Sequence, residues 1–456
     1  MAKNAVRDLT QGSPMKLILG FMLPLLFGMI FQQFYNMVDT IIVGQFLGIN
    51  DLAGVGSTGS INFLVMGFVI GVCAGFAIPV AQKFGSKDYA ELKKYVGNTV
   101  WISLIFAAVL TTATCLLCSK ILELMNTPED VFAPARDYIF VIFLGIPVTF
   151  LYNILSGFIR SLGDSKTPVV FLIISSLLNI ALDIFMIVVL GMGVAGAGWA
   201  TVISQFVSAV LCLVFIKKRF ELLHISRDDL KIRRYYIGRL CAVGLPMGLQ
   251  YSITAIGTIL LQAAVNGLGS VVIAAVTAGN KVGQFMCCPF DAMGSTMATY
   301  GGQNVGAGKL DRLKRGLFDC IILGIIWAFI ALAISYFFGD SLSAMFINTN
   351  DPETAQNAAE IIRLSKQFLV YTALFYIPLA FVNIVRFLIQ GMGSSQIALY
   401  AGVFELIARG VVAICFVPIF GFDAVCFAGP AAWILADCFL IPAFFVCFKM
   451  IKRNIG

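Results

Sequence analysis

The chain has 456 residues, of which 59% are hydrophobic and only 12% are charged, and its mean hydropathy is +0.93. These values exclude an ordinary soluble domain, in which about a quarter of the residues are charged. The formal charge of +7 does not indicate nucleic-acid binding, because most basic residues lie in short segments between apolar stretches, where they set membrane orientation. The sequence therefore predicts a protein of the lipid bilayer, with no nucleic-acid partner.

Apolar stretches long enough to cross a bilayer follow one another from Leu17 to the end of the chain. A span needs about 20 such residues, so the sequence predicts an all-α membrane protein with about twelve transmembrane helices. The first span is too long for the core of a signal peptide and is expected to remain as a helix. The predicted spans are 17–44, 52–82, 96–118, 131–159, 167–190, 193–216, 240–268, 271–303, 316–338, 357–391, 394–418 and 422–448.

Lys and Arg gather at both ends of the chain and in every second break between spans. Basic residues resist translocation, so these segments are expected on the cytoplasmic side, and both termini with them. We expect a multi-pass protein of the cytoplasmic membrane of a bacterium or archaeon.

The second half of the sequence repeats the first at a spacing of about 221 to 231 residues. Residues 82–85, for example, match residues 303–306. Each copy holds an even number of spans, so both copies enter the membrane from the same side, as in a parallel repeat. We therefore expect two six-helix bundles, 1–216 and 240–456, joined by a cytoplasmic linker, 217–239.

Motifs for catalysis and cofactor binding are missing from the sequence. The 12 cysteines lie in or beside apolar spans without metal-ligand spacing, as buried thiols do. Gly306, Gly308 and Lys309 resemble the end of a P-loop, but Gln303 stands where its first Gly is needed. The sequence predicts a protein that is not an enzyme and needs no cofactor.

Two carboxyl groups, Asp39 and Asp183, fall inside spans of the first bundle. An ionisable residue in hydrocarbon costs at least a few kcal/mol, so it marks a functional site. A helix rises about 1.5 Å per residue, which places Asp39 about 8 Å and Asp183 about 10 Å from the outer ends of their spans. Tyr138 and Thr201 lie at a similar depth, roughly 10 to 12 Å from the same surface. A polar layer is expected there.

The layer suits a proton or a cation. Two buried carboxyl groups close together cannot both ionise cheaply, so the pair can hold a proton. Alternatively, Asp39 and Asp183 with the oxygens of Asn179 and Thr201 form an all-oxygen site for a hard cation such as sodium. Asn36 adds a second amide, on the face of Asp39. The structural alternative is that each Asp is neutral and simply bonds a neighbouring polar group.

The second bundle carries a different set of charges. Glu405 precedes Arg409 by four residues, the favourable orientation for a helical ion pair, and Lys281 is a candidate third member. The cluster either fixes packing or contacts substrate. The other intramembrane charges, to which the sequence assigns no partner, are Asp291, Arg386 and Asp437.

Pro24 interrupts the first span, and Gly28 follows one turn later. Proline removes a backbone hydrogen bond, so the helix can bend there and move Asp39. A proline that serves packing alone is the alternative, because proline is common in membrane helices.

Several motifs occur together: Pro24, residues 32–39, Gly157 with residues 160–164, Asn179 with Asp183, residues 193–201 and residues 302–304. This set resembles the multidrug and toxic compound extrusion (MATE) family over essentially the whole chain. The Asp pair resembles its DinF-like branch, in which the matching positions are implicated in proton or sodium coupling. Gln250 and Leu379 stand where other branches place second-bundle acids.

The resemblance implies a V-shaped pair of bundles around a central cavity, and export of cationic or amphipathic small molecules by antiport, in alternating access. We expect a monomer whose only ligands are its substrate and the coupling ion, H⁺ or Na⁺. The alternatives are a flippase for lipid-linked precursors, which needs a basic cavity, and a channel or scaffold without coupled transport. The expected cavity residues are Gln32, Asn36, Tyr138, Asn153, Gln205, Lys281, Arg386, Glu405 and Arg409.

Overall fold

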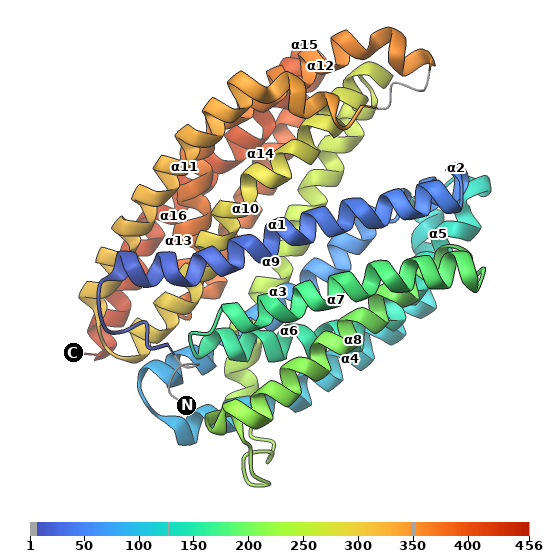
Figure 1. Ribbon diagram of the computed structural model, residues 1–456. Helices are drawn as coiled ribbons and strands as arrows, with labels where there is room; N and C mark the ends of the chain where they lie inside the picture. Colours follow the sequence, from blue (N-terminus) through green and yellow to red (C-terminus); the bar gives the residue numbers. More distant parts are fainter. Residues whose placement is uncertain (1–6, 126, 348–351, 456) are drawn as a thin grey trace. The chain divides into compact units, whose positions relative to one another are not determined.

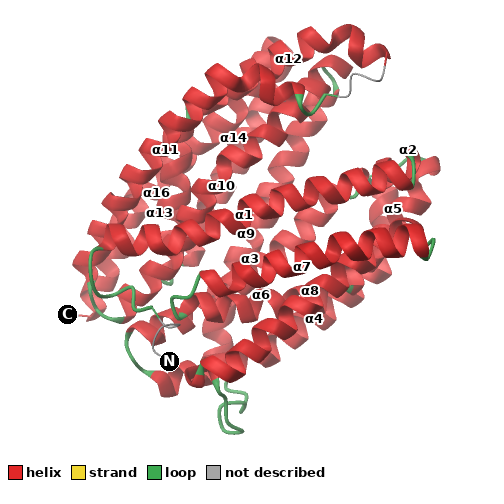
Figure 2. Cartoon of the chain, viewed as in Figure 1, coloured by secondary structure: helices red, strands yellow, loops and turns green. Residues whose placement is uncertain are grey.

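The computed structural model describes residues 7–125, 127–347 and 352–455, and Figure 2 shows this part of the chain as helices joined by short loops. The helices of the first half are α1 (Pro14–Phe46), α2 (Ile49–Ser57), α3 (Gly59–Gly85), α4 (Tyr89–Leu124), α5 (Glu129–Leu144), α6 (Ile146–Ser161), α7 (Lys166–Ile184) and α8 (Gly193–Arg219). Those of the second half are α9 (Arg234–Asn266), α10 (Ser270–Gly306), α11 (Leu310–Ala344), α12 (Pro352–Ala373), α13 (Tyr376–Gly391), α14 (Ser395–Val411), α15 (Val417–Phe420) and α16 (Phe422–Ile455).

The number of spans agrees with the predicted membrane fold. Ten helical segments of the described chain are long and apolar enough to cross a bilayer, and two bent pairs bring the number to 12 if each pair is one span. The bent pairs correct two predicted elements, 131–159 and 357–391, which are not continuous helices. The chain bends by 46° between α5 and α6 and by 53° between α12 and α13. Pro147 and Pro378 lie in the first turns of α6 and α13, where a missing N–H is tolerated but the preceding helix cannot continue unbroken.

Two further irregularities lie at matching places in the two halves. α7 is followed by a π-helical turn at Phe185–Val189, and α14 by one at Val412–Phe416. Single π-helical turns are frequent at functional sites. These turns follow directly on the helices that carry Asp183 and Arg409.

Contacts within the described chain divide it into two compact units. In the first unit α7 packs against α8 and α3 against α6, and in the second α14 packs against α16 and α11 against α12 (Figure 1). Helices α1, α9 and α10 are each divided between the units, so the continuous bundles 1–216 and 240–456 stay a prediction. The first unit holds the residues up to Gln11, Leu23–Ser252 and Gly302–Gly308; the second holds Gly12–Met22, Ile253–Gly301 and the chain from Lys309 on.

The predicted linker is docked on α4. Asn98 Nδ2 donates to the carbonyl of Lys231 (3.3 Å), and Asn98 Oδ1 accepts from the N–H of Arg233 (2.9 Å). Trp101 Nε1 donates to the carbonyl of Leu230 (2.8 Å). These bonds satisfy main-chain groups of the linker and tie it to the first unit.

The motif at 302–304 holds the N-terminal segment in place. Gln303 Oε1 accepts from the N–H of Leu9 (2.9 Å), and its Nε2 donates to the carbonyl of Ser161 (2.8 Å). Asn304 Nδ2 donates to the carbonyl of Leu9 (3.3 Å). Both amide side chains are fully buried, so their hydrogen bonds replace those that water would otherwise make. This part of the family resemblance has a structural role.

The repeat-related segments 82–85 and 303–306 pack on each other reciprocally within the first unit. A Cβ atom at Gly85 would overlap the carbonyl of Gln303, and one at Gly306 would overlap the carbonyl of Gln82. Only glycine permits this approach of two helix ends. The contact therefore depends on matching glycines from the two halves.

We predict that Gly306→Ala lowers the free energy of unfolding by about 1–3 kcal/mol, because an extra methyl at this crossing forces main-chain atoms apart. Gly283→Ala on the same helix is the control: no atom lies within 4 Å of a Cβ built there, and alanine is the better helix former. Thermal unfolding in detergent measures both. Equal melting temperatures for Gly306→Ala and Gly283→Ala would contradict the close crossing.

Candidate functional site

The carboxyl groups of Asp39 on α1 and Asp183 on α7 lie next to each other in the first unit. Asp183 has no exposed surface, and Asp39 is partly buried. Both belong to helices that can cross the membrane. The structure therefore brings together the two acids that the sequence placed at one depth.

Four polar side chains surround the pair. The amide Nδ2 of Asn179 lies 3.5 Å from Thr201 Oγ1, which links α7 to α8. The Tyr35 side chain lies beside Thr201, and Tyr138 on α5 is within electrostatic range of both carboxyl groups. Tyr35 was not among the predicted site residues. It lies one turn before Asp39 on the same face of α1, and this spacing could have identified it.

Several acceptor oxygens in this group are not satisfied by the protein. Both carboxyl oxygens of Asp183, Oδ1 of Asp39 and Oδ1 of Asn179 are buried without a hydrogen-bond partner among the residues that the structure describes. A buried acceptor without a partner costs roughly 1–3 kcal/mol, and more when it is charged. A proton on the pair, or a small cation between these oxygens, removes that cost. The residues present therefore fit either ion.

Close helix packing positions the site. Gly198 brings α8 onto α5, because a Cβ there would lie 3.0 Å from Val141 Cβ. Gly28 does the same between α1 and α7, where a Cβ would lie 2.9 Å from Val169 Cγ2. Thr201 and Asn179 lie on helices that approach closely, as α7 and α8 do in Figure 1.

The turn before α7 sets where this helix begins. Gly163 adopts a positive φ of 89°, which favours glycine. Asp164 Oδ1 then accepts from the N–H groups of Lys166 and Thr167 (3.0 Å each), as a capping carboxylate does at a helix N-terminus. The Gly-Asp pair of the family resemblance thus starts the helix that carries Asn179 and Asp183.

Other predicted cavity residues form hydrogen bonds that do not include the residues around the carboxyl pair. Asn153 Nδ2 donates to the carbonyl of Thr149 (2.8 Å), and Gln205 Oε1 accepts from the Thr149 hydroxyl (2.8 Å). The Thr149–Gln205 bond connects α6 to α8. Gln32 and Asn36 on α1 are exposed.

The charges of the second unit form a buried cluster. Arg386 on α13 forms an ion pair with Glu405 Oε1, and Arg409 Nη2 lies 3.6 Å from Glu405 Oε2. Glu405 and Arg386 are 3% and 5% exposed. The Glu405–Arg409 pair was predicted from their spacing, but the contribution of α13 was not.

The remaining charges of the second unit are placed as follows. Asp291 on α10 and Asp437 on α16 are within electrostatic range of Arg386. Lys281 is exposed and forms no ion pair with a residue of the described chain, so it is not the third member of the cluster. The expected Lys281 contact is replaced by Arg386. Both arginines of the cluster share one carboxylate, in a region where two further acids lie nearby.

The MatE family model matches the chain twice, over residues 24–185 and 246–415. The chain belongs to the MATE family. Its relatives include a probable multidrug resistance protein, YoeA, of Bacillus subtilis. The two are 30% identical over 340 residues, which cover 73% of this chain and 73% of the relative. An FAD transporter of Shewanella oneidensis is 23% identical over 345 residues, 75% of this chain and 76% of the relative. A solved outward-facing conformation of a multidrug resistance MATE family transporter matches with a TM-score of 0.89, at 21% identity and 99% coverage of both chains.

Membership confirms several expectations drawn from the sequence. The protein is a multi-pass membrane transporter with the MATE fold, and it is not an enzyme. The two copies of the family model coincide with the two halves of the internal repeat. Its MATE relatives carry different names for what they transport, so the substrate does not follow from the family.

We predict that Glu405→Gln destabilises this MATE protein by about 3 kcal/mol, because it leaves two buried arginines without their shared carboxylate. The double substitution Glu405→Leu with Arg386→Met should restore part of that loss, since only Arg409 then lacks its carboxylate instead of both arginines. Unfolding in detergent measures both effects.

The control is Glu360→Gln, whose ion pair with Arg363 is exposed on the surface (3.6 Å) and worth at most about 1 kcal/mol. If the double variant loses as much unfolding free energy as the two single variants together, Glu405 and Arg386 do not interact.

Proposed function

We propose that this MATE protein is a cation-coupled antiporter of the DinF-like branch, which exports cationic or amphipathic small molecules across the cytoplasmic membrane. The coupling ion is a proton or sodium, and Asp39 and Asp183 carry it. Asn179, Thr201 and Tyr138 complete the site. The protein acts as a monomer, with both termini in the cytoplasm.

The observation that carries this proposal is the buried carboxyl pair with unsatisfied oxygens. Asp183 is fully buried, and neither of its oxygens has a hydrogen-bond partner in the described chain. Such a pair is stable only with a proton or a cation, because two adjacent anions in a medium of low dielectric constant repel strongly. An ion that must be present when substrate is absent can be exchanged for a substrate cation, and this exchange is antiport.

The charges of the second unit favour a drug antiporter over a flippase for lipid-linked precursors. A flippase for phosphate-bearing precursors needs free cations in its cavity. Arg386 and Arg409 instead share Glu405, and Asp291 and Asp437 are further carboxyl groups within electrostatic range of Arg386. This environment disfavours a phosphate and tolerates a cation.

Pro24 gives α1 a position at which bending can connect ion binding to movement. Contacts assign α1 to one unit up to Met22 and to the other from Leu23, next to Pro24. Proline cannot donate the backbone hydrogen bond of a continuous helix, so bending there is inexpensive. Asp39 lies four turns further along the same helix, and its position therefore depends on the bend.

We predict that Asp39→Asn and Asp183→Asn each abolish gradient-driven export and leave folding intact, since the amide is nearly isosteric but cannot take up a proton or neutralise a cation. The assay is uptake of a cationic dye into proteoliposomes under an imposed pH or sodium gradient. Asp137→Asn is the control, because Asp137 adjoins Tyr138 but is exposed. Full export by both purified variants would remove the carboxyl pair from the mechanism.

We predict that Pro24→Ala retains substrate binding but slows turnover, because it restores a backbone hydrogen bond where α1 would otherwise bend easily. Spin labels at Ile41 and Leu177, which are 48% and 58% exposed, report the movement of α1 against α7 within the first unit. In a background without native cysteines, their distance should change with pH or sodium only when Pro24 is present. A distance insensitive to both ions, or a normal rate for Pro24→Ala, would refute the bend as coupling element.

A further inference from the structure

Residues 7–11 form a short strap that lies against the ends of α6 and α10 within the first unit. The N–H of Arg7 donates to the carbonyl of Leu162, which directly follows α6 (3.1 Å). The N–H of Leu9 donates to Gln303 Oε1, at the end of α10 (2.9 Å). The main chain of one short segment therefore pairs with a helix end from each half of the repeat.

Gln303 closes this contact with both ends of its amide. Its Oε1 accepts from the strap, and its Nε2 donates to the carbonyl of Ser161 on α6 (2.8 Å). Asn304 Nδ2 adds a bond to the carbonyl of Leu9 (3.3 Å). Gln303, Asn304 and Leu9 are fully buried. A dry network of amide groups thus joins the strap, α6 and α10.

The strap can detach without the melting of a helix, because it is not helical. Within it, the N–H of Thr10 donates to Asp8 Oδ1 (2.8 Å). Leu9 and Thr10 are buried, whereas Arg7 and Gln11 on either side of them are exposed. Detachment exchanges a few hydrogen bonds for bonds to water and exposes one leucine side chain, which is a small local opening.

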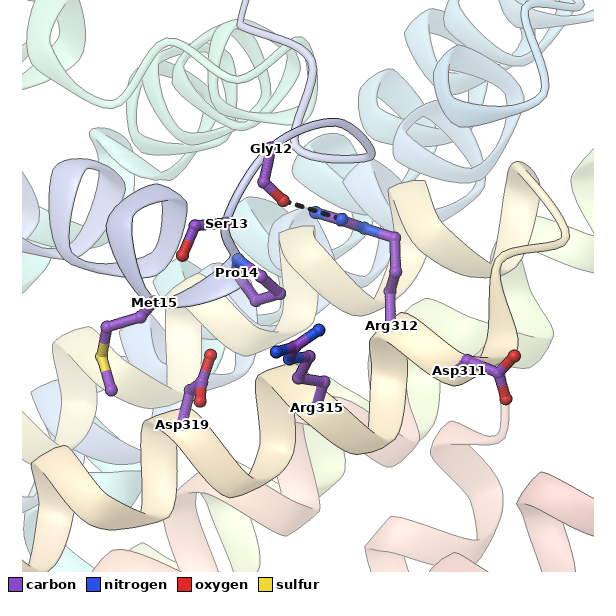
Figure 3. Close-up of a pocket in the computed structure, with 8 residues that line it drawn as sticks. All are labelled: Gly12, Ser13, Pro14, Met15, Asp311, Arg312, Arg315 and Asp319. Carbon is purple, nitrogen blue, oxygen red and sulfur yellow. Dashed lines mark hydrogen bonds between the residues drawn. The ribbon is translucent and has the colours of Figure 1, made fainter.

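The chain turns at Gly12, directly after the strap. Gly12 has a φ of 94°, and no neighbouring atom of the described chain lies within 4 Å of a Cβ built there. Arg312 Nη1 on α11 donates to the carbonyl of Gly12 (2.8 Å), as Figure 3 shows. Contacts assign both of these residues to the second unit. The strap can therefore rotate about Gly12 while the segment that leads into α1 stays held by Arg312.

The strap holds a part of α10 that differs in its contacts from the rest of that helix. Contacts assign α10 to the second unit up to Gly301, and to the first unit from Gly302. The strap, the Gln303–Ser161 bond and the glycine crossing described above keep this helix end in the first unit. A transporter that works by alternating access must separate such contacts on one side of the membrane in each cycle.

We propose that the strap is a latch that opens once in each transport cycle. When closed, it binds the end of α10 to α6 through Gln303 and Asn304. When open, it lets the end of α10 leave the first unit and lets water reach Gln303. The inference rests on transport by alternating access, which belongs to the proposed function, but not on the identity of the coupling ion or of the substrate.

The test is the distance between spin labels at Arg7 on the strap and Lys166 at the start of α7, two exposed residues of the first unit. Pulsed electron paramagnetic resonance measures it in a background without native cysteines. The conditions are low and high pH, with and without sodium, and with and without a cationic dye. We expect a short distance for the closed latch and a longer one for the open latch, with shares that change between conditions.

Two variants weaken the latch. Gln303→Met has a similar size but lacks both amide bonds, so it should favour the longer distance about tenfold. Leu9→Ala should also favour it, because it removes the buried anchor of the strap and leaves the helix ends unchanged. Gln284→Met is the control, since Gln284 is an exposed glutamine on the same helix.

One unchanged distance in the native strap under every condition would overturn the proposal. A shift by Gln303→Met no larger than that by Gln284→Met would also overturn it, because the described contact would then not hold the strap. Melting temperatures identify an unfolded variant, and Leu9→Ala decides if Gln303→Met unfolds. Gradient-driven export by a labelled protein whose strap distance stays constant would refute the latch and leave the proposed function intact. A strap that moves in a protein that exports no dye would count against the proposed function instead.

Discussion

We propose that transport depends on two adjacent carboxyl groups, one of them fully buried. Asp183 is fully buried, Asp39 lies beside it, and neither is paired with a basic residue in the described chain. In a soluble protein, water would enter or an arginine would neutralise such a pair. Here hydrocarbon surrounds the unit and the neighbouring side chains are neutral, so the charge must be balanced by an ion from outside. The close packing at Gly28 and Gly198, and the cap at Asp164, hold the helices that bring these groups together.

The two halves of the repeat use one scaffold for different chemistry. Each half breaks one span at an Ile-Pro pair and places a π-helical turn at the end of the following span. In the first half that span carries Asp183, which lacks an internal counter-ion. In the second it carries Glu405 and Arg409, which are paired with each other and with Arg386. Glu405 is thus paired with basic residues of its own unit, whereas Asp183 is not, so ion coupling is expected of the first half.

Much of the fold could be predicted from the sequence, because hydrophobic length and the placement of basic residues act locally. The common depth of Asp39 and Asp183 follows from the helical rise alone.

The bends before Pro147 and Pro378 were missed because both flanking segments are apolar, and proline inside an apolar stretch is compatible with one continuous span. The Arg386–Glu405 pair was missed for another reason: which faces of α13 and α14 meet depends on helix rotation in the packed unit, and no local pattern encodes it. The docking of the linker on Asn98 was missed because the linker takes part through main-chain groups, so its amino-acid composition does not indicate the contact.

The account requires that substrate and coupling ion compete for the Asp39–Asp183 pair. The most direct measurement is the number of protons or sodium ions that purified protein releases when it binds a cationic dye in weakly buffered detergent solution. We predict release of about one ion per dye bound, as a pH change or as displaced radioactive sodium, and no release from Asp183→Asn even where the dye still binds. Dye binding to the native protein that releases neither ion would contradict the central claim.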